Sequence, residues 1–255
     1  MYNPAGMKLS VQCYTVRQAL SQDLWGTFRA LQAMGLNYVE VGGDYGVSAS
    51  ELKQGLDEIG LKVSASHASM DEIENGFDKV VEENRIYGCK CVVLSSVNKS
   101  KYSQGWDVVA KQLEEIGARF RDEGFLFGYH NHSFEFRLQD GKPGLDTLYE
   151  NSDPKLLQAQ LDTYWVAFGN ADPVEYIRKL KGRVSYLHFK DGKLGVEEPH
   201  FLEVGQGDLK WDEILEACHE SEVEYAAIEQ DTCERPELES VKMSVDFLRS
   251  KGVSD

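Results

Sequence analysis

Short apolar runs and amphipathic stretches alternate along the whole chain, at a spacing of roughly 30 residues. The runs are rich in Val, Ile, Tyr and Phe, which is typical of buried strands. Several amphipathic stretches begin at Ser or Asp and end at Gly, as helices commonly do. We predict eight strands, over residues 8–14, 38–43, 61–66, 91–96, 125–132, 157–165, 184–191 and 225–231. We predict helices over residues 23–35, 48–60, 107–124 and 172–182.

This alternation predicts parallel strands joined by right-handed crossovers, and eight such units close a (β/α)8 TIM barrel. The main alternative is an open, doubly wound sheet, which usually has fewer strands. No G-x-G-x-x-G follows the first predicted strand, so a dinucleotide site is not indicated. No linker divides the chain, and we predict one α/β domain over residues 1–255. Residues 191–200 are predicted to form a long loop after the seventh strand.

The charge balance excludes two classes of partner. The chain has 43 acidic and 27 basic residues, a net charge of −16, and no run of Lys or Arg. It therefore lacks the field that attracts nucleic acids or anionic membranes. The first ten residues do not resemble a signal peptide, and no apolar run approaches the roughly 20 residues that span a bilayer. The five cysteines form no C-x-x-C pair and are interpreted as free thiols, so we expect a soluble, cytoplasmic protein.

Ionisable side chains gather at the predicted strand ends, where the active sites of TIM barrels lie. Residues two apart on a strand face the same side, so several of these side chains can share one pocket. Burying them together is costly unless a cation or a substrate offsets the loss of hydration. Carboxylates combined with imidazoles suit Mn²⁺, Co²⁺, Zn²⁺ or Mg²⁺. The set consists of Glu40, His67, His130, His132, Asp162, His188, Lys190, Glu229 and Asp231.

Five segments, in this order and at these spacings, resemble one family: YHNHSFEF, LDTYWVAFGNADP, GRVSYLHFKD, EVGQGDLKW and AIEQD. They are similar to the sugar phosphate isomerase/epimerase family of xylose isomerase-like TIM barrels. Wider relatives include inosose dehydratase, ketose 3-epimerases, hydroxypyruvate isomerase and endonuclease IV. The likeness runs from about residue 8 to residue 249. It implies one divalent metal ion at the barrel mouth, with Asp162, His188 and Glu229 as three of its ligands.

The fourth ligand departs from the family pattern. Isomerases and epimerases of this group usually have a Glu near the position of His130, whereas the nearest Glu here is Glu135. An odd offset places Glu135 on the opposite face of the strand unless the chain turns after His132. Three alternatives remain: Glu135 after such a turn, His130 or His132, or a three-ligand site completed by water and substrate. We favour Glu135, because a hard cation shared with Asp162 and Glu229 favours another oxygen.

The resemblance implies proton transfer next to a carbonyl group that a metal ion polarises as a Lewis acid. Candidates for moving the proton are Glu229, Glu135 and His132. Lys190 is expected to donate to a substrate oxygen, and its inert alternative is an ion pair with Asp231 or Glu40. The residues expected to contact the substrate are Glu40, His67, His130, Trp165 and Asp231. Trp165 has an alternative role in packing under the mouth, and His67 one as a hydrogen-bonded core histidine.

Three functions stay open at this point. The first is a metal-dependent isomerase or epimerase of a sugar or keto-sugar. The second is a lyase or dehydratase acting on an inosose or a 3-keto-sugar, and the third is a non-catalytic sugar-binding barrel. The partner is a small carbohydrate in each case, and a homodimer is left open. Endonuclease IV chemistry is disfavoured, because that branch needs Asp-x-x-His and Asp162 is followed at the third position by Trp165. Phosphate binding by the glycine loop at 203–211 is also disfavoured, because no Lys-Ser/Thr follows it.

Overall fold

A computed structural model describes residues 6–253 of the chain. The predicted domain, 1–255, extends beyond this range at both ends. The prediction about the N-terminal segment concerns residues 1–5 in part, and these lie outside the described residues. Among residues 6–253, no helix is both long and apolar enough to cross a membrane.

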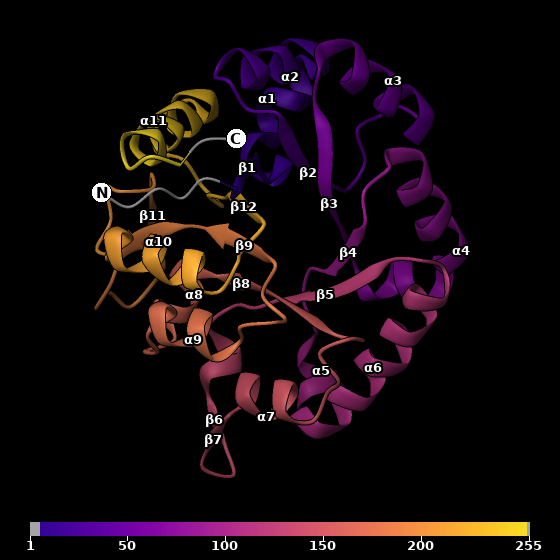
Figure 1. Ribbon diagram of the computed structural model, residues 1–255, viewed down its shortest axis with the longest axis vertical. Helices are drawn as coiled ribbons and strands as arrows, with labels where there is room; N and C mark the ends of the chain where they lie inside the picture. Colours follow the sequence, from indigo (N-terminus) through magenta and orange to yellow (C-terminus); the bar gives the residue numbers. More distant parts are fainter. Residues whose placement is uncertain (1–5, 254–255) are drawn as a thin grey trace.

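Eight parallel strands form a barrel, with β1 next to β12 and the remaining neighbours in the order β9, β8, β5, β4, β3 and β2. A bridge between Gln12 and Glu40 brings β1 beside β2 and nearly closes the ring. This confirms the predicted (β/α)8 fold (Figure 1). The strands are β1 (Lys8–Val11), β2 (Tyr38–Gly42), β3 (Lys62–Ala68), β4 (Cys91–Leu94), β5 (Leu126–His130), β8 (Gln158–Asp162), β9 (Tyr186–Phe189) and β12 (Tyr225–Ile228).

Helices surround the strands on the outside of the barrel (Figure 1). Two of them have complete N-terminal capping boxes, Ser48 with Glu51 on α3 and Ser69 with Glu72 on α4. The helices are α1 (Arg17–Gln22), α2 (Leu24–Ala33), α3 (Ala49–Ile59), α4 (Met70–Tyr87), α5 (Lys99–Tyr102), α6 (Trp106–Asp122), α7 (Gly144–Glu150), α8 (Thr163–Phe168), α9 (Pro173–Lys179), α10 (Trp211–Glu220) and α11 (Glu237–Ser250). Two 3₁₀ turns, η1 (Cys13–Val16) and η2 (Phe134–Phe136), follow β1 and β5.

The main hydrophobic core lies between the strands and the helices. On β1, Leu9 and Val11 belong to this core, whereas the hydroxyl of Ser10 lies 2.9 Å from that of Ser64 on β3. This alternation is the two-residue period of a strand that packs outward and fills the barrel inward. The packing of the outward-facing side chains against the helices holds in place the strand ends that carry the polar side chains.

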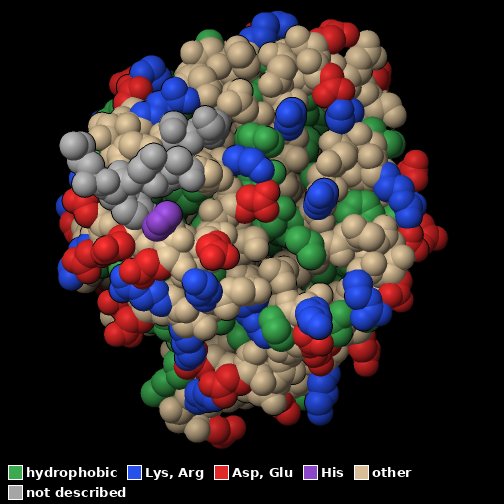
Figure 2. Space-filling view, viewed as in Figure 1, with side chains coloured by type: hydrophobic (Ala, Val, Ile, Leu, Met, Phe, Trp, Pro, Cys, Tyr) green, Lys and Arg blue, Asp and Glu red, His purple; other side chains and the backbone are tan. Residues whose placement is uncertain are grey.

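Two strand pairs lie outside the barrel. Residues 191–200, predicted as a loop, contain β10 (Asp191–Lys193), which pairs antiparallel with β11 (His200–Leu202). A second pair, β6 (Leu138–Gln139) and β7 (Lys142–Pro143), projects from the body at the bottom of Figure 1. On the face seen in Figure 2, acidic and basic side chains are interspersed rather than gathered into a patch of one sign.

Candidate active site at the mouth of the barrel

A pocket of about 590 Å³ opens at the carboxyl ends of the barrel strands. Tyr14 lines this pocket with 51 % of its surface exposed, and it was not among the site residues predicted from the sequence. The structure brings six of the predicted site residues together around this pocket. Those lining the pocket are His67, His130, His132, Lys190, Glu229 and Asp231.

Four buried side chains form a cluster able to hold a metal ion. Nitrogen or oxygen atoms of His130, Asp162, His188 and Glu229 all lie within 4.8 Å of one another. They come from β5, β8 and β9 and from the residue directly after β12, four strands that are consecutive neighbours in the barrel. We call these four residues the donor cluster. Two carboxylates with two imidazoles make a mixed oxygen and nitrogen set that suits a divalent transition metal.

Asp162 is held so that its two oxygen atoms have different partners. The Trp165 backbone N–H donates to Oδ1 over 2.8 Å, which caps α8. The backbone N–H of Asp162 donates to the Asn131 side chain. Oδ2 forms an ion pair with Lys190 but has no hydrogen-bond partner among residues 6–253. A buried oxygen of this kind is available to a cation.

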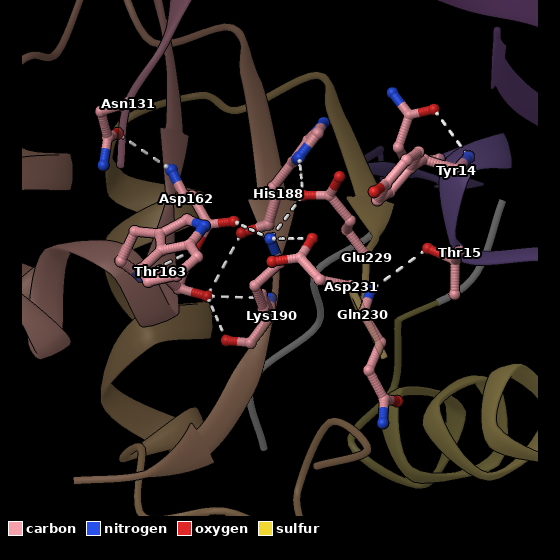
Figure 3. A network of polar contacts seen from close by, with 12 residues as sticks. Tyr14, Thr15, Asn131, Asp162, Thr163, His188, Lys190, Glu229, Gln230 and Asp231 are labelled. Carbon is pink, nitrogen blue, oxygen red and sulfur yellow. Dashed lines mark hydrogen bonds and ion pairs between the residues drawn. The ribbon is translucent and has the colours of Figure 1, made fainter. Parts of the chain in front are cut away.

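His188 lies between two carboxylates (Figure 3 shows its contact with Glu229). Its Nδ1 is 2.7 Å from Glu229 Oε2, and its Nε2 is 2.6 Å from Glu40 Oε1. Burial lowers the pKa of His188, but the charges of Glu40 and Glu229 outweigh this effect and raise it to about 10. The two contacts with Glu229 and Glu40 fix the orientation of the His188 ring.

Lys190 extends its ammonium group into the same region (Figure 3). Its Nζ lies 2.8 Å from Glu229 Oε2, 3.1 Å from Asp231 Oδ1 and 3.2 Å from Asp162 Oδ2. Burial lowers the pKa of Lys190, but these carboxylates raise it above its ordinary value. Of the two inert partners considered from the sequence, Asp231 is one that the structure brings into contact with Lys190.

The chain turns after His132, as a role for Glu135 in the site requires. The 3₁₀ turn η2 brings Glu135 into the interior, where it is 0 % exposed. The Tyr129 hydroxyl donates to one carboxylate oxygen over 2.6 Å, and the His132 backbone N–H donates to the other over 3.0 Å. Burial raises the pKa of Glu135 to about 7. Glu135 is not in the donor cluster, in which His130 stands beside the three ligands that the resemblance implied.

His130 and His132 are held as neutral rings near pH 7. Burial, followed by the charge of His188, lowers the pKa of His130 well below its ordinary value. Burial and the nearby Lys190 lower the pKa of His132 to about 4. The Nδ1 atoms of both rings are buried and have no hydrogen-bond partner in the described part of the chain. These nitrogens are available to a metal ion or to a substrate.

Glu40 was predicted to contact the substrate, but the structure places it beneath the pocket with 1 % of its surface exposed. Its carboxylate accepts hydrogen bonds from Gln12 Nε2 over 2.7 Å and from Gln160 Nε2 over 2.8 Å, and it lies 2.9 Å from His67 Nε2. Burial raises the pKa of Glu40, but His188 and His67 reverse this and hold it low. Sequence reasoning missed both glutamines. The position of Gln160, two residues before Asp162 on the same strand face, was the available signal.

Contacts in the structure bear on two further expectations. Trp165 is 9 % exposed and packs against Phe201, with ring centres 5.4 Å apart, so it lies under the mouth. In the glycine loop, the backbone N–H groups of Gly205 and Gly207 donate to Asp191. These amides are therefore engaged by a carboxylate of the protein itself, which leaves no phosphate cradle in this loop.

Comparison with known proteins agrees with this geometry. A family model described as xylose isomerase-like TIM barrel matches residues 28–251. The chain belongs to this family. An inosose dehydratase of Lacticaseibacillus casei is 25 % identical over 224 residues, which cover 73 % of this chain and 74 % of that protein. These findings confirm the resemblance seen in the sequence, and the family and the relatives point to an enzyme of sugar metabolism.

Two solved structures are also similar to this chain. A sugar phosphate isomerase/epimerase from Parabacteroides distasonis superposes with a TM-score of 0.82 at 25 % identity, covering 96 % of this chain and 94 % of that one. A structure of IolI protein with a bound zinc atom superposes with a TM-score of 0.79 at 15 % identity, covering 98 % and 100 % of the two chains. At 15 % identity, the second likeness shows the fold alone.

Proposed function

We propose that this xylose isomerase-like barrel is a metal-dependent isomerase or epimerase of a sugar or keto-sugar. The observation that supports it most is the donor cluster, whose buried Asp162 Oδ2 and His130 Nδ1 have no hydrogen-bond partner in the described chain. We propose His130, Asp162, His188 and Glu229 as ligands of one Mn²⁺, Co²⁺, Zn²⁺ or Mg²⁺ ion. When bound, such an ion supplies Lewis-acid polarisation of a carbonyl oxygen, which makes the neighbouring C–H group more acidic.

The side chains that line the pocket then have distinct roles. Glu229 removes the proton from the substrate carbon, since its carboxylate lines the pocket and is 7 % exposed. His132 is neutral, and its Nδ1, which has no hydrogen-bond partner within residues 6–253, accepts a proton and later returns it. Lys190 donates a hydrogen bond to a substrate oxygen that gains negative charge. Glu135, whose pKa is raised, holds His132 in position by accepting a hydrogen bond from the His132 backbone N–H.

A lyase or dehydratase acting on an inosose or a 3-keto-sugar is the second candidate. Its support is the likeness to proteins named inosose dehydratase, at 25 % identity over 73 % of this chain. Both reactions begin with removal of a proton next to a carbonyl group. They differ in the next step, because a dehydratase expels a hydroxyl group where an epimerase returns the proton.

A substrate panel in deuterated water separates these candidates. Metal-loaded protein would be incubated with ketoses and inososes, and the products followed by NMR. Deuterium incorporation without loss of water supports the isomerase or epimerase, whereas an unsaturated or rearranged ketone that has lost water supports the dehydratase. Binding of a sugar with neither result would contradict both and favour a non-catalytic sugar-binding barrel.

We further propose that the protein acts in the cytoplasm on a small carbohydrate. In support of this, all five cysteines are free, and four of them are buried. Free thiols are usual in a reducing compartment. Fractionation of cells that produce the protein would test the location. The homodimer stays a prediction, which the molar mass in solution would decide.

A further inference from the structure

The ammonium group of Lys190 contacts two of the four side chains in the donor cluster (Figure 3). Its Nζ lies 2.8 Å from Glu229 Oε2 and 3.2 Å from Asp162 Oδ2. The lysine side chain is 1 % exposed, so bulk water and salt screen these contacts little. A cation held by the donor cluster would use the same two carboxylates.

The Lys190 ammonium group and a metal ion cannot both bind Asp162 and Glu229 as strongly as either does alone. Like charges a few ångströms apart repel strongly in a buried site. Metal binding through Asp162 and Glu229 therefore weakens their contacts with Lys190. By linkage, those contacts weaken metal binding by the same factor.

A third carboxylate gives Lys190 an alternative partner. Asp231 Oδ1 lies 3.1 Å from Nζ, and Asp231 does not belong to the donor cluster. Asp231 lines the pocket, and its side chain is 27 % exposed, against 0 % for Asp162 and 7 % for Glu229. A lysine that keeps only Asp231 therefore lies nearer to the space that a substrate enters.

We propose that Lys190 competes with the metal ion for Asp162 and Glu229, and that metal binding leaves Lys190 paired with Asp231 on the substrate side of the pocket. The inference rests on the proposed metal site. It makes Lys190 a residue that sets the metal affinity. It also orders the two binding events, because the ammonium group becomes available to a substrate oxygen after the metal has bound.

The metal affinity of a lysine variant tests this competition. Lys190→Met in the full chain removes the charge and keeps an unbranched side chain. We expect its Kd for Mn²⁺, measured by competition with a fluorescent chelator, to be at least about 10-fold lower than that of the wild type. Lys193→Met is the matched control, because Lys193 is 44 % exposed and pairs with Asp208 over 2.8 Å. For this control we expect a change of less than about 2-fold.

A second measurement uses the unaltered protein, because buried carboxylates that lose their cation can impair the folding of Lys190→Met. Lys190 Nζ lies 5.3 Å from the centre of the Trp165 ring. A displaced ammonium group changes the electric field at this indole. Titration of the wild type with Zn²⁺ should therefore shift the tryptophan emission maximum, and Trp165→Phe should remove the shift.

The outcomes separate this inference from the proposed function. If the wild type binds no divalent ion, both fail. If the wild type binds the ion while Lys190→Met binds it no more tightly, the competition is contradicted and the metal site stands. If Lys190→Met does not fold, the emission decides: a Zn²⁺-saturated wild type with unchanged emission contradicts the displacement, and a shift that depends on Trp165 supports it.

Discussion

Glu40 Oε1 lies 2.6 Å from Nε2 of His188, and this contact sets which nitrogen of the imidazole faces the donor cluster. Because Nε2 is directed at Glu40, Nδ1 faces Glu229, 2.7 Å away, and is the nitrogen that a metal ion would take in place of a proton. In many proteins, a carboxylate bonded to the ring nitrogen that does not contact the metal ion orients a metal-binding histidine. Glu40 is in turn held by Gln12 and Gln160. Glu40 is therefore a positioning residue for His188.

Glu40→Gln should weaken metal binding while the barrel stays folded. Gln keeps the shape of the side chain but loses the charge that holds His188, and we expect the Kd for Mn²⁺ to rise by about 10- to 100-fold. The chelator competition assay measures this change. Glu72→Gln is the control, because Glu72 also lines the pocket but bonds to Ser69 at the start of α4. Equal effects of the two substitutions would mean that Glu40 acts only by adding negative charge to the pocket, and would contradict its role in positioning His188.

The charges of the pocket predict an unphosphorylated substrate. Among the described lining residues, Lys190 is the only Lys or Arg, and carboxylates contact it on three sides. Glu72, Glu229 and Asp231 add negative charge. A phosphate group would meet net repulsion, so we expect a phosphorylated sugar to bind at least about 10-fold more weakly than its unphosphorylated form. Calorimetric titration of matched pairs measures the ratio, and tighter binding of the phosphorylated members would contradict this expectation.

Asp191 anchors the glycine loop, and its loss should lower stability. The backbone N–H groups of Gly205 and Gly207 and the indole N–H of Trp211 donate to its Oδ2, the last over 2.6 Å. Asp191→Ala leaves these donors unpaired, so we expect the free energy of unfolding to fall by about 3 kcal/mol or more in urea titrations. Asp208→Ala is the control. Asp208 is 38 % exposed, and we expect Asp208→Ala to lower the free energy of unfolding less than Asp191→Ala does.

Cysteine reactivity should separate one thiol from the other four. Cys233 is half-buried, whereas the remaining cysteines are buried. Burial raises the pKa of Cys13 and of Cys89 to about 12, so little thiolate forms at pH 8. With a colorimetric thiol reagent at pH 8, we expect one rapid reaction per native chain and five in urea. Cys233→Ser should abolish the rapid reaction, and rapid labelling that persists in this variant would contradict the burial of the others.

The fold could be predicted from the sequence because its signal is repeated. Eight apolar runs alternate with amphipathic stretches, and no single boundary has to be right for the barrel to emerge. Asp162, His188 and Glu229 were likewise predictable from the motifs of the xylose isomerase-like family. Their positions at strand ends follow from the fold, which explains why the structure brings them together.

The depth of Glu40 and the fourth member of the donor cluster depend on backbone geometry that the sequence does not reveal. Val39 and Val41 pack in the main core, so the two-residue period of the strand points Glu40 into the barrel, where the side chains of Gln12 and Gln160 bind it below the pocket. Glu135 enters the interior because the chain turns after His132, and there the Tyr129 hydroxyl binds it. Strand parity alone leaves the choice between Glu135 and His130 open, and the structure places His130, not Glu135, in the donor cluster.

Metal-dependent proton transfer at the donor cluster is the central claim, and Glu229 tests it most directly. With a substrate found in the panel, the rate of deuterium incorporation from D₂O would be compared for metal-loaded wild type, metal-free wild type and Glu229→Gln. We predict that removal of the metal or of the Glu229 carboxylate lowers the rate by at least about 100-fold. Incorporation at the wild-type rate by Glu229→Gln would contradict the account.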